Sequence, residues 1–284
     1  MRWSRHGTAA KVLLGALLLT GPAGANIDLP LLSRVEKILS FPDNVDPQQL
    51  LRFSKLRDLT IEIRIKTGDM LPPALHSLLM DRFAGIPKRI VLSKMPTERA
   101  IERLRKFEPL EVVVFLSGKS NEMNELDRLY ALGPVRKRVV LPGDSGSEAL
   151  RKATELNFSE LGIIAGPAGT LDREALRLLV SEKARKKVVY LLADATTEAL
   201  LDLTAIAPLA IEVRTVRNRI PEALLGVLKD MRLVDIVLLV DGRITQEDAR
   251  QWASLGRFSL HVHIEDANEI TPGLSGLLDS ISPP

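Results

Sequence analysis

Two histidines and an acid lie close together near the end of the chain, in the segment Leu260-His-Val-His-Ile-Glu265. His261 and His263 are two residues apart, so on a strand both imidazoles project to the same side, about 6–7 Å apart. With Glu265 they offer ligand types that a divalent metal accepts. The sequence identifies no third strong ligand on a neighbouring strand. We therefore interpret the pair as a polar stripe on one strand, and we predict no metal and no cofactor.

A repeated acid-x-base pattern marks two other apolar segments. Glu62 and Arg64 stand in Ile61-Glu-Ile-Arg-Ile, and Glu212 and Arg214 stand in Ile211-Glu-Val-Arg. Such pairs either neutralise each other on an exposed face, which contributes little stability, or form a polar recognition surface. Together with apolar side chains of the central segments they give our candidate binding residues, which are Glu62, Arg64, Val113, Phe115, Glu212, Arg214, Leu239, His261 and His263.

Polar residues also follow the apolar segments and suggest an alternative, enzymatic function. In a barrel of parallel strands they would lie at the end where catalysis takes place, and acids there could act as general acid and base in a hydrolase. No complete catalytic motif such as GxSxG, HExxH or GxxxxGK[ST] accompanies them. The residues concerned are Asp69, Ser117, Lys119, Asp144, Asp194, Asp241, Arg243, Glu265 and Asp266.

The elements that position these residues are short apolar runs that alternate with amphipathic stretches. The centres of nine such runs recur every 23–29 residues, which predicts parallel strands joined by helices. The predicted strands are 59–65, 88–93, 110–116, 137–141, 161–165, 187–192, 209–214, 234–240 and 258–264.

The helices between the strands are predicted from their start signals. Each start signal is a threonine or aspartate followed closely by an acid and an amphipathic run, and its side chain can accept a hydrogen bond from a backbone N–H of the first helical turn. These residues are Thr97, Asp172, Thr196 and Thr245. The basic cluster Arg136-Lys-Arg138 follows one predicted helix, and we interpret it as a solvated helix end.

Several junctions share an apolar spacing of three, three, two and two, as in Phe53, Leu56, Leu59, Ile61 and Ile63. Over residues 53–264 the chain thereby resembles the leucine-rich-repeat family. The resemblance implies an open solenoid of about nine βα repeats. The family carries an asparagine after each strand. At the matching positions this chain has Arg64, Phe115, Arg214, Leu239 and His263.

The alternative fold is a (β/α)8 barrel. Its strands are buried on both faces and read as continuous apolar runs, as residues 112–116 and 236–240 do. In the solenoid the central apolar side chains would line an open concave face, whereas in the barrel they would fill the interior. Both folds remain open at this point.

Residues 26–58 are predicted to form an N-terminal helical cap, with helices around 31–40 and 47–56. The repeat domain is then expected over 59–270, and residues 271–284 form a C-terminal tail. In a solenoid such a cap would cover the exposed core of the first repeat.

Residues 1–25 read as a secretory signal, with Arg2, Arg5 and Lys11, an apolar run over 12–19 and a cleavage site at Ala23-Gly-Ala25. We expect export to a bacterial periplasm or beyond the cell. Without these residues the 39 basic residues fall by three to 36 and equal the 36 acidic ones, which gives no electrostatic case for nucleic acid.

The sequence analysis therefore favours an exported, non-enzymatic scaffold. It would recognise a protein, a peptide or a glycan through its sheet face, and it would have no integral membrane segment after cleavage. The chain has no cysteine, which excludes disulfides and thiol catalysis.

Overall fold

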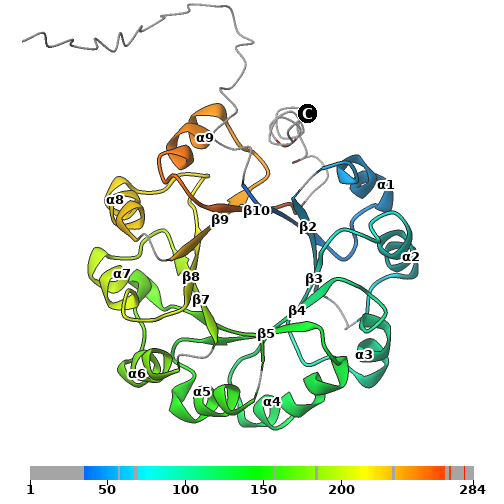
Figure 1. Ribbon diagram of the computed structural model, residues 1–284, viewed down its shortest axis with the longest axis horizontal. Helices are drawn as coiled ribbons and strands as arrows, with labels where there is room; N and C mark the ends of the chain where they lie inside the picture. Colours follow the sequence, from blue (N-terminus) through cyan, green and yellow to red (C-terminus); the bar gives the residue numbers. More distant parts are fainter. Residues whose placement is uncertain are drawn as a thin grey trace, which may run out of the picture.

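The computed structural model describes residues 35–56, 58–66, 70–156, 158–182, 185–231, 234–265, 269 and 278. In this part of the chain ten parallel strands form one sheet that closes on itself (Figure 1). The strands are β1 (Lys37–Pro42), β2 (Leu59–Ile65), β3 (Lys88–Leu92), β4 (Leu110–Phe115), β5 (Arg136–Pro142), β6 (Glu160–Ile164), β7 (Lys186–Leu192), β8 (Leu209–Arg214), β9 (Asp235–Asp241) and β10 (Ser259–His263).

The helices surround this barrel and connect consecutive strands, as parallel pairing requires (Figure 1). Thr97, Asp172, Thr196 and Thr245 accept hydrogen bonds from the first turns of their helices, which confirms these start signals. The α-helices are α1 (Pro47–Leu50), α2 (Pro73–Asp81), α3 (Glu98–Leu104), α4 (Ser120–Asn124), α5 (Gly146–Glu155), α6 (Arg173–Ser181), α7 (Thr197–Leu203), α8 (Glu222–Asp230) and α9 (Gln246–Ala253), and the 3₁₀ turns are η2 (Leu51–Phe53), η3 (Leu126–Leu132) and η4 (Pro167–Gly169).

The barrel is closed by the pairing of β1 with both β2 and β10. Lys37 lies opposite Leu59 on one side and opposite Leu260 on the other. The open leucine-rich-repeat solenoid is therefore wrong. The closed βα barrel, our alternative, is confirmed, but it has ten strands where the (β/α)8 barrel has eight. Closure gives each of the ten described strands two neighbours, so this sheet has no edge with unpaired backbone groups.

The helix predicted around residues 31–40 is also wrong where the structure describes it. Residues 37–42, Lys-Ile-Leu-Ser-Phe-Pro, form β1, and all six are buried. Leu39 and Phe41 of this strand belong to the apolar core outside the sheet, whereas Ile38 lines a cavity inside the barrel and Ser40 contacts Glu62 there. The second predicted helix, around 47–56, is present as α1 followed by η2.

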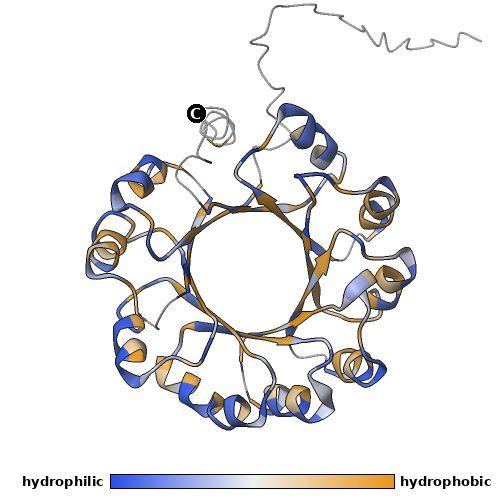
Figure 2. Ribbon diagram, turned by 180° about the vertical axis from the view of Figure 1, so that it is seen from behind, coloured by the Kyte–Doolittle hydropathy of each residue, from blue (hydrophilic) through white to orange (hydrophobic). Residues whose placement is uncertain are grey.

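The apolar core lies between the outside of the sheet and the helices. Outward-facing residues such as Ile61, Ile63 and Val112 pack against helix residues such as Leu75 and Leu79. The strands are largely hydrophobic, and the helices are hydrophilic on their outer parts (Figure 2). No helix in the described ranges is long and apolar enough to span a bilayer.

The inside of the barrel differs from this core because it carries the polar residues. A barrel widens with its number of strands, and about eight strands give an interior that side chains just fill. Ten strands enclose more space, and two cavities occupy the interior here. The alternating polar residues of β2, β8 and β10, which the sequence suggested for an exposed face or a recognition surface, face this enclosed space.

Candidate functional site: the upper cavity

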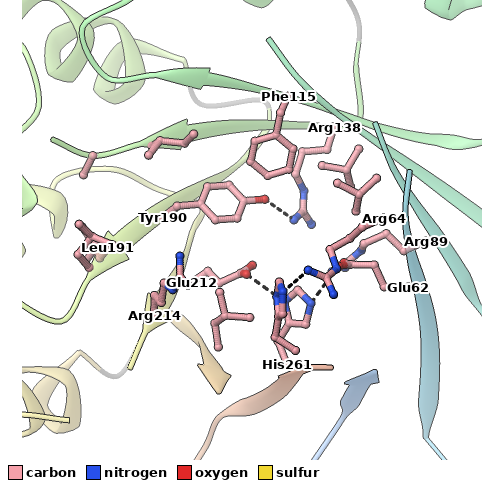
Figure 3. A pocket seen from close by; sticks show the side chains of 17 residues that line it. Glu62, Arg64, Arg89, Phe115, Arg138, Tyr190, Leu191, Glu212, Arg214 and His261 are labelled. Carbon is pink, nitrogen blue, oxygen red and sulfur yellow. Dashed lines mark hydrogen bonds and ion pairs between the residues drawn. The ribbon is translucent and has the colours of Figure 1, made fainter. Parts of the chain in front are cut away.

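The upper cavity lies inside the barrel at the carboxyl ends of the strands and has a volume of about 280 Å³. Side chains from β2 to β10 converge on it (Figure 3). Its described lining consists of Glu62, Arg64, Arg89, Val91, Val113, Phe115, Arg138, Ile164, Ala165, Tyr190, Leu191, Leu192, Glu212, Arg214, Leu239, His261 and His263.

The floor of the upper cavity is a layer of buried charges centred on His261. The Nε2 atom of His261 lies 3.1 Å from Glu62 Oε1, and its Nδ1 atom lies 2.9 Å from Glu212 Oε1. The imidazole thus stands between two carboxylates that come from β2 and β8 (Figure 3). Ser40 Oγ donates a further hydrogen bond of 2.6 Å to Glu62.

Two arginines continue this charged layer around the barrel. Arg89 Nε donates to Glu111 Oε2 at 2.9 Å, and Arg89 Nη1 lies 3.4 Å from Glu62 Oε2. Arg138 lies 3.0 Å from Glu111 Oε1 and donates through Nε to Glu160 Oε2 at 2.7 Å. Each of these charges has an opposite neighbour, which removes most of the cost of burying it.

Burial and ion pairing shift the pKa values of the floor residues away from neutral pH. Burial alone would lower the pKa of His261, but the Glu62 and Glu212 carboxylates raise it to about 9. Burial alone would raise the pKa of Glu62, but the charges of His261 and Arg89 lower it. Burial raises the pKa of Tyr190 to about 12, against the opposing charge of Arg138. At pH 7 His261 is a cation that donates from both nitrogens.

Apolar side chains form the wall above this floor. Val91, Val113, Phe115 and Leu239 line it, and the rings of Phe115 and Tyr190 contact each other at a centroid distance of 5.7 Å. At the mouth, Ile164 and Leu192 are 39% and 47% exposed although both are large and hydrophobic.

A rim of basic residues surrounds the mouth. Arg64 Nη1 donates to Glu265 Oε1 at 2.6 Å, and Arg64 Nη2 donates to the carbonyl of Ile264 at 2.8 Å. His263 contacts both Arg64 and Glu265, and burial lowers its pKa. Arg214, at the end of β8, is exposed, and its side chain makes no ion pair within the described ranges.

The lower cavity, at the amino ends of the strands, has a volume of about 360 Å³. It shares Arg89, Arg138 and Glu212 with the upper cavity, so the charged layer separates the two. Its described lining includes the exposed ion pair of Lys186 and Asp235, at 2.8 Å.

All the candidate binding residues predicted from the sequence line the upper cavity. They come together because the barrel closes, not because an open sheet presents them. Of the polar residues considered for hydrolysis, Asp144, Asp194 and Asp241 are absent from the described lining, and Glu265 approaches it only through Arg64 and His263. Asp69 and Asp266 lie outside the described residues.

The environment of the two histidines opposes cation binding. Both nitrogens of His261 already face carboxylates, and a guanidinium contacts His263. Within the described ranges no three histidine, aspartate or glutamate side chains gather in a metal-binding cluster.

Sequence reasoning missed five residues of the floor, namely Arg89, Glu111, Arg138, Glu160 and Tyr190. Arg138 was interpreted as part of a solvated cluster, yet it is buried inside β5. A signal was present, because charges of alternating sign recur at matched positions of successive strands. Glu62 lies opposite Arg89, Arg89 lies opposite Glu111, and Arg138 lies opposite Glu160.

Comparison with known proteins assigns no family. No protein-family model and no curated protein matches the chain. Among solved structures the chain is similar to Cwp6 from Clostridium difficile, with 12% sequence identity, a TM-score of 0.30 and coverage of 88% of this chain and 44% of that chain. The chain thus spans less than half the length of that structure, and the function has to be inferred from the cavity itself.

Proposed function

We propose that the protein is an exported, non-enzymatic binding protein that holds a small organic molecule with an apolar body in the upper cavity. The observation that carries this proposal is the apolar wall of Val91, Val113, Phe115 and Leu239 above a floor whose charges are already paired. A cavity of about 280 Å³ is near the lower end of ligand pockets, which span roughly 300–1,000 Å³.

The exposed mouth supports the same function. Ile164 and Leu192 keep apolar surface in contact with water at the entrance, and a bound apolar molecule would cover part of it. Hydrophobic contact with such a molecule is favourable in proportion to the apolar area removed from water. The ligand proposed here is smaller than the protein, peptide or glycan that the sequence suggested, because the binding face is the inside of a barrel.

The state of the ionisable groups favours binding over catalysis. A general acid or base acts best when its pKa lies near the working pH. In the floor, the pKa of His261 is raised to about 9, that of Tyr190 is raised to about 12, and that of Glu62 is lowered. These groups therefore hold their charge states at neutral pH and serve to fix the shape and polarity of the cavity.

Titration with the neutral fluorophore N-phenyl-1-naphthylamine tests this function. We expect saturable binding with one site per chain. Leu239→Trp, which fills the cavity, and Ile164→Trp, which narrows its mouth, should each weaken binding at least tenfold. Leu201→Trp is the matched control, because Leu201 is 56% exposed on the outer helix α7, and it should bind as the unaltered protein does.

Absence of saturable binding would overturn the proposal. So would unchanged affinity in Ile164→Trp, whose exposed position allows the protein to fold normally. Circular dichroism of each variant shows whether the barrel is formed.

A further inference from the structure

The charges around the upper cavity are divided between a balanced floor and an unbalanced rim. In the floor, the acids and bases alternate and contact one another. Arg136, which is exposed at the lower cavity, adds a second cation at 2.7 Å from Glu160. The balanced set consists of Glu62, Glu111, Glu160 and Glu212 with Arg89, Arg136, Arg138 and His261.

The rim carries an excess of positive charge. Among the described residues that line the cavity, the acids are Glu62 and Glu212, and both belong to the floor. Arg64 and Arg214 line the mouth, and the acid beside Arg64 is Glu265, which also binds Lys66 at 2.7 Å. Arg64 and Lys66 thus share Glu265, and Arg214 makes no ion pair with a described acid.

Two donor groups at this rim lack an acceptor among the described residues. Arg214 has no ion pair with any residue that the structure describes, although it lines the cavity. Arg64 is held by Glu265 and Ile264 through its terminal nitrogens, but its Nε atom is buried without a hydrogen-bond partner in the described part of the chain. A buried donor without an acceptor is unfavourable, so the Arg64 side chain is not fully satisfied in its present position.

The two arginines approach the mouth from well-separated strands. Arg64 lies on β2 and Arg214 on β8, and β1, β10 and β9 stand between these strands in the sheet order. A planar guanidinium binds a carboxylate through two parallel hydrogen bonds, and such charge-assisted bonds are among the stronger polar contacts in proteins.

We propose that the ligand of the upper cavity is a small organic carboxylate whose acid group lies at the rim against Arg214, with Arg64 adding positive charge to that rim, and whose apolar body lies against Val113, Phe115 and Leu239. This inference rests on the proposed binding function and adds the charge of the ligand. The ligand enters with its apolar end first, because the basic groups are at the mouth and the apolar wall is deeper.

A matched set of competitors tests the inference. Octanoate, 1-octanol and octylamine share an apolar chain and differ in charge, and each is titrated against bound N-phenyl-1-naphthylamine at low ionic strength. We expect octanoate to displace the fluorophore at a concentration at least tenfold lower than octanol, and octylamine to be the weakest. Arg214→Gln should reduce the preference for octanoate over octanol to less than threefold.

A charge reversal and a surface control complete the experiment. Arg214→Glu should make octylamine a better competitor than octanoate. Arg177→Gln removes the same charge from the exposed face of α6 and should keep the original order. If octanol competes as well as octanoate, or if Arg214→Gln keeps the preference, the carboxylate inference is wrong while the binding function stands. If the neutral fluorophore itself fails to bind, the binding function fails first.

Discussion

His261 owes its charge to two carboxylates from strands far apart in the sequence. Because burial alone would neutralise the imidazole, the cation exists only while Glu62 and Glu212 flank it. Substitution of either glutamate therefore removes one of the two charges that keep His261 protonated. The cavity floor behaves as one electrostatic unit.

The raised pKa of His261 predicts a specific dependence of stability on pH. Its pKa is about 9 in the folded protein against an ordinary value of 6.5, so its stabilising contribution is complete below pH 6.5 and is lost as the pH rises through 9. We expect the difference in unfolding free energy between the unaltered protein and His261→Gln to shrink between pH 6.5 and pH 9. Urea denaturation at several pH values measures it.

His76→Gln is the control for this measurement. His76 is half-buried on α2, and burial lowers its pKa, so it stays neutral over the same range. Its effect on stability should be independent of pH between 6.5 and 9. A His261→Gln difference that is equally constant would show that the imidazole is not charged in the folded protein.

The pair of Arg89 and Glu111 predicts a double-mutant effect. Arg89→Met leaves Glu111 with Arg138 alone and Glu62 with His261 alone, and loss of one buried partner typically costs about 3–5 kcal/mol. Adding Glu111→Leu removes the excess negative charge, so the double variant should be more stable than Arg89→Met by at least about 1 kcal/mol. Urea denaturation of the unaltered protein, the two single variants and the double variant gives the interaction free energy between the two side chains. Additive losses would mean that the two side chains do not interact.

At the scale of the elements, β6 and β7 depend on a glycine inside the barrel. A Cβ atom on Gly162 would lie 2.7 Å from Val140 Cγ2 and 3.1 Å from Tyr190 Cε2. Because Gly162 has no side chain, the Tyr190 ring can lie across β6 and reach the cavity floor. There Arg138 Nη1 donates a hydrogen bond of 3.0 Å to Tyr190 Oη.

Gly162→Ala should therefore destabilise the barrel and disturb the floor. Overpacking of this kind costs about 1–3 kcal/mol. Gly226→Ala, on α8 with nothing within 4 Å of the added Cβ, is the control and should be neutral or stabilising. Thermal unfolding compares them, and the near-ultraviolet circular dichroism of tyrosine reports on the ring. Equal melting temperatures for the two variants would contradict the packing described here.

The elements also show which predictions sequence patterns support. The strands from β2 to β10 were predictable because their outward-facing positions are regularly apolar, and this pattern follows from packing against helices. β1 was not, because Leu31, Val35, Ile38 and Leu39 are spaced as on one face of a helix, which predicts a helix over this segment. The charged floor was missed because partners such as Arg138 and Glu160 are 22 residues apart and meet only through the register of the sheet.

For the molecule as a whole, closure predicts a compact particle in solution. A globular chain of this length has a radius of gyration of about 18–19 Å, whereas an open solenoid would be more extended. Small-angle scattering measures this radius. A value several ångströms above this range for a monomer would contradict the closed barrel.

The export proposal predicts the first residue of the mature protein. If residues 1–25 are removed on export, mass spectrometry of the mature chain should give Asn26 as the N-terminus. Replacing Ala23 and Ala25 by leucine should leave uncleaved precursor, whereas replacing Ala9 and Ala10 should not. An intact Met1 on the mature protein would overturn the proposal.

Because β1 pairs with β10, the barrel cannot close until the last strand has been made. His261 on β10 reaches Glu62, which is 199 residues away, and until it arrives Glu62 and Glu212 lack the cation that both of them flank. A chain that emerges from a ribosome or a translocation channel from its N-terminus can build its repeats in order. It cannot place the His261 imidazole between Glu62 and Glu212 before the last strand has emerged. Contacts of such long range slow folding, so closure of the barrel is expected to be a late step.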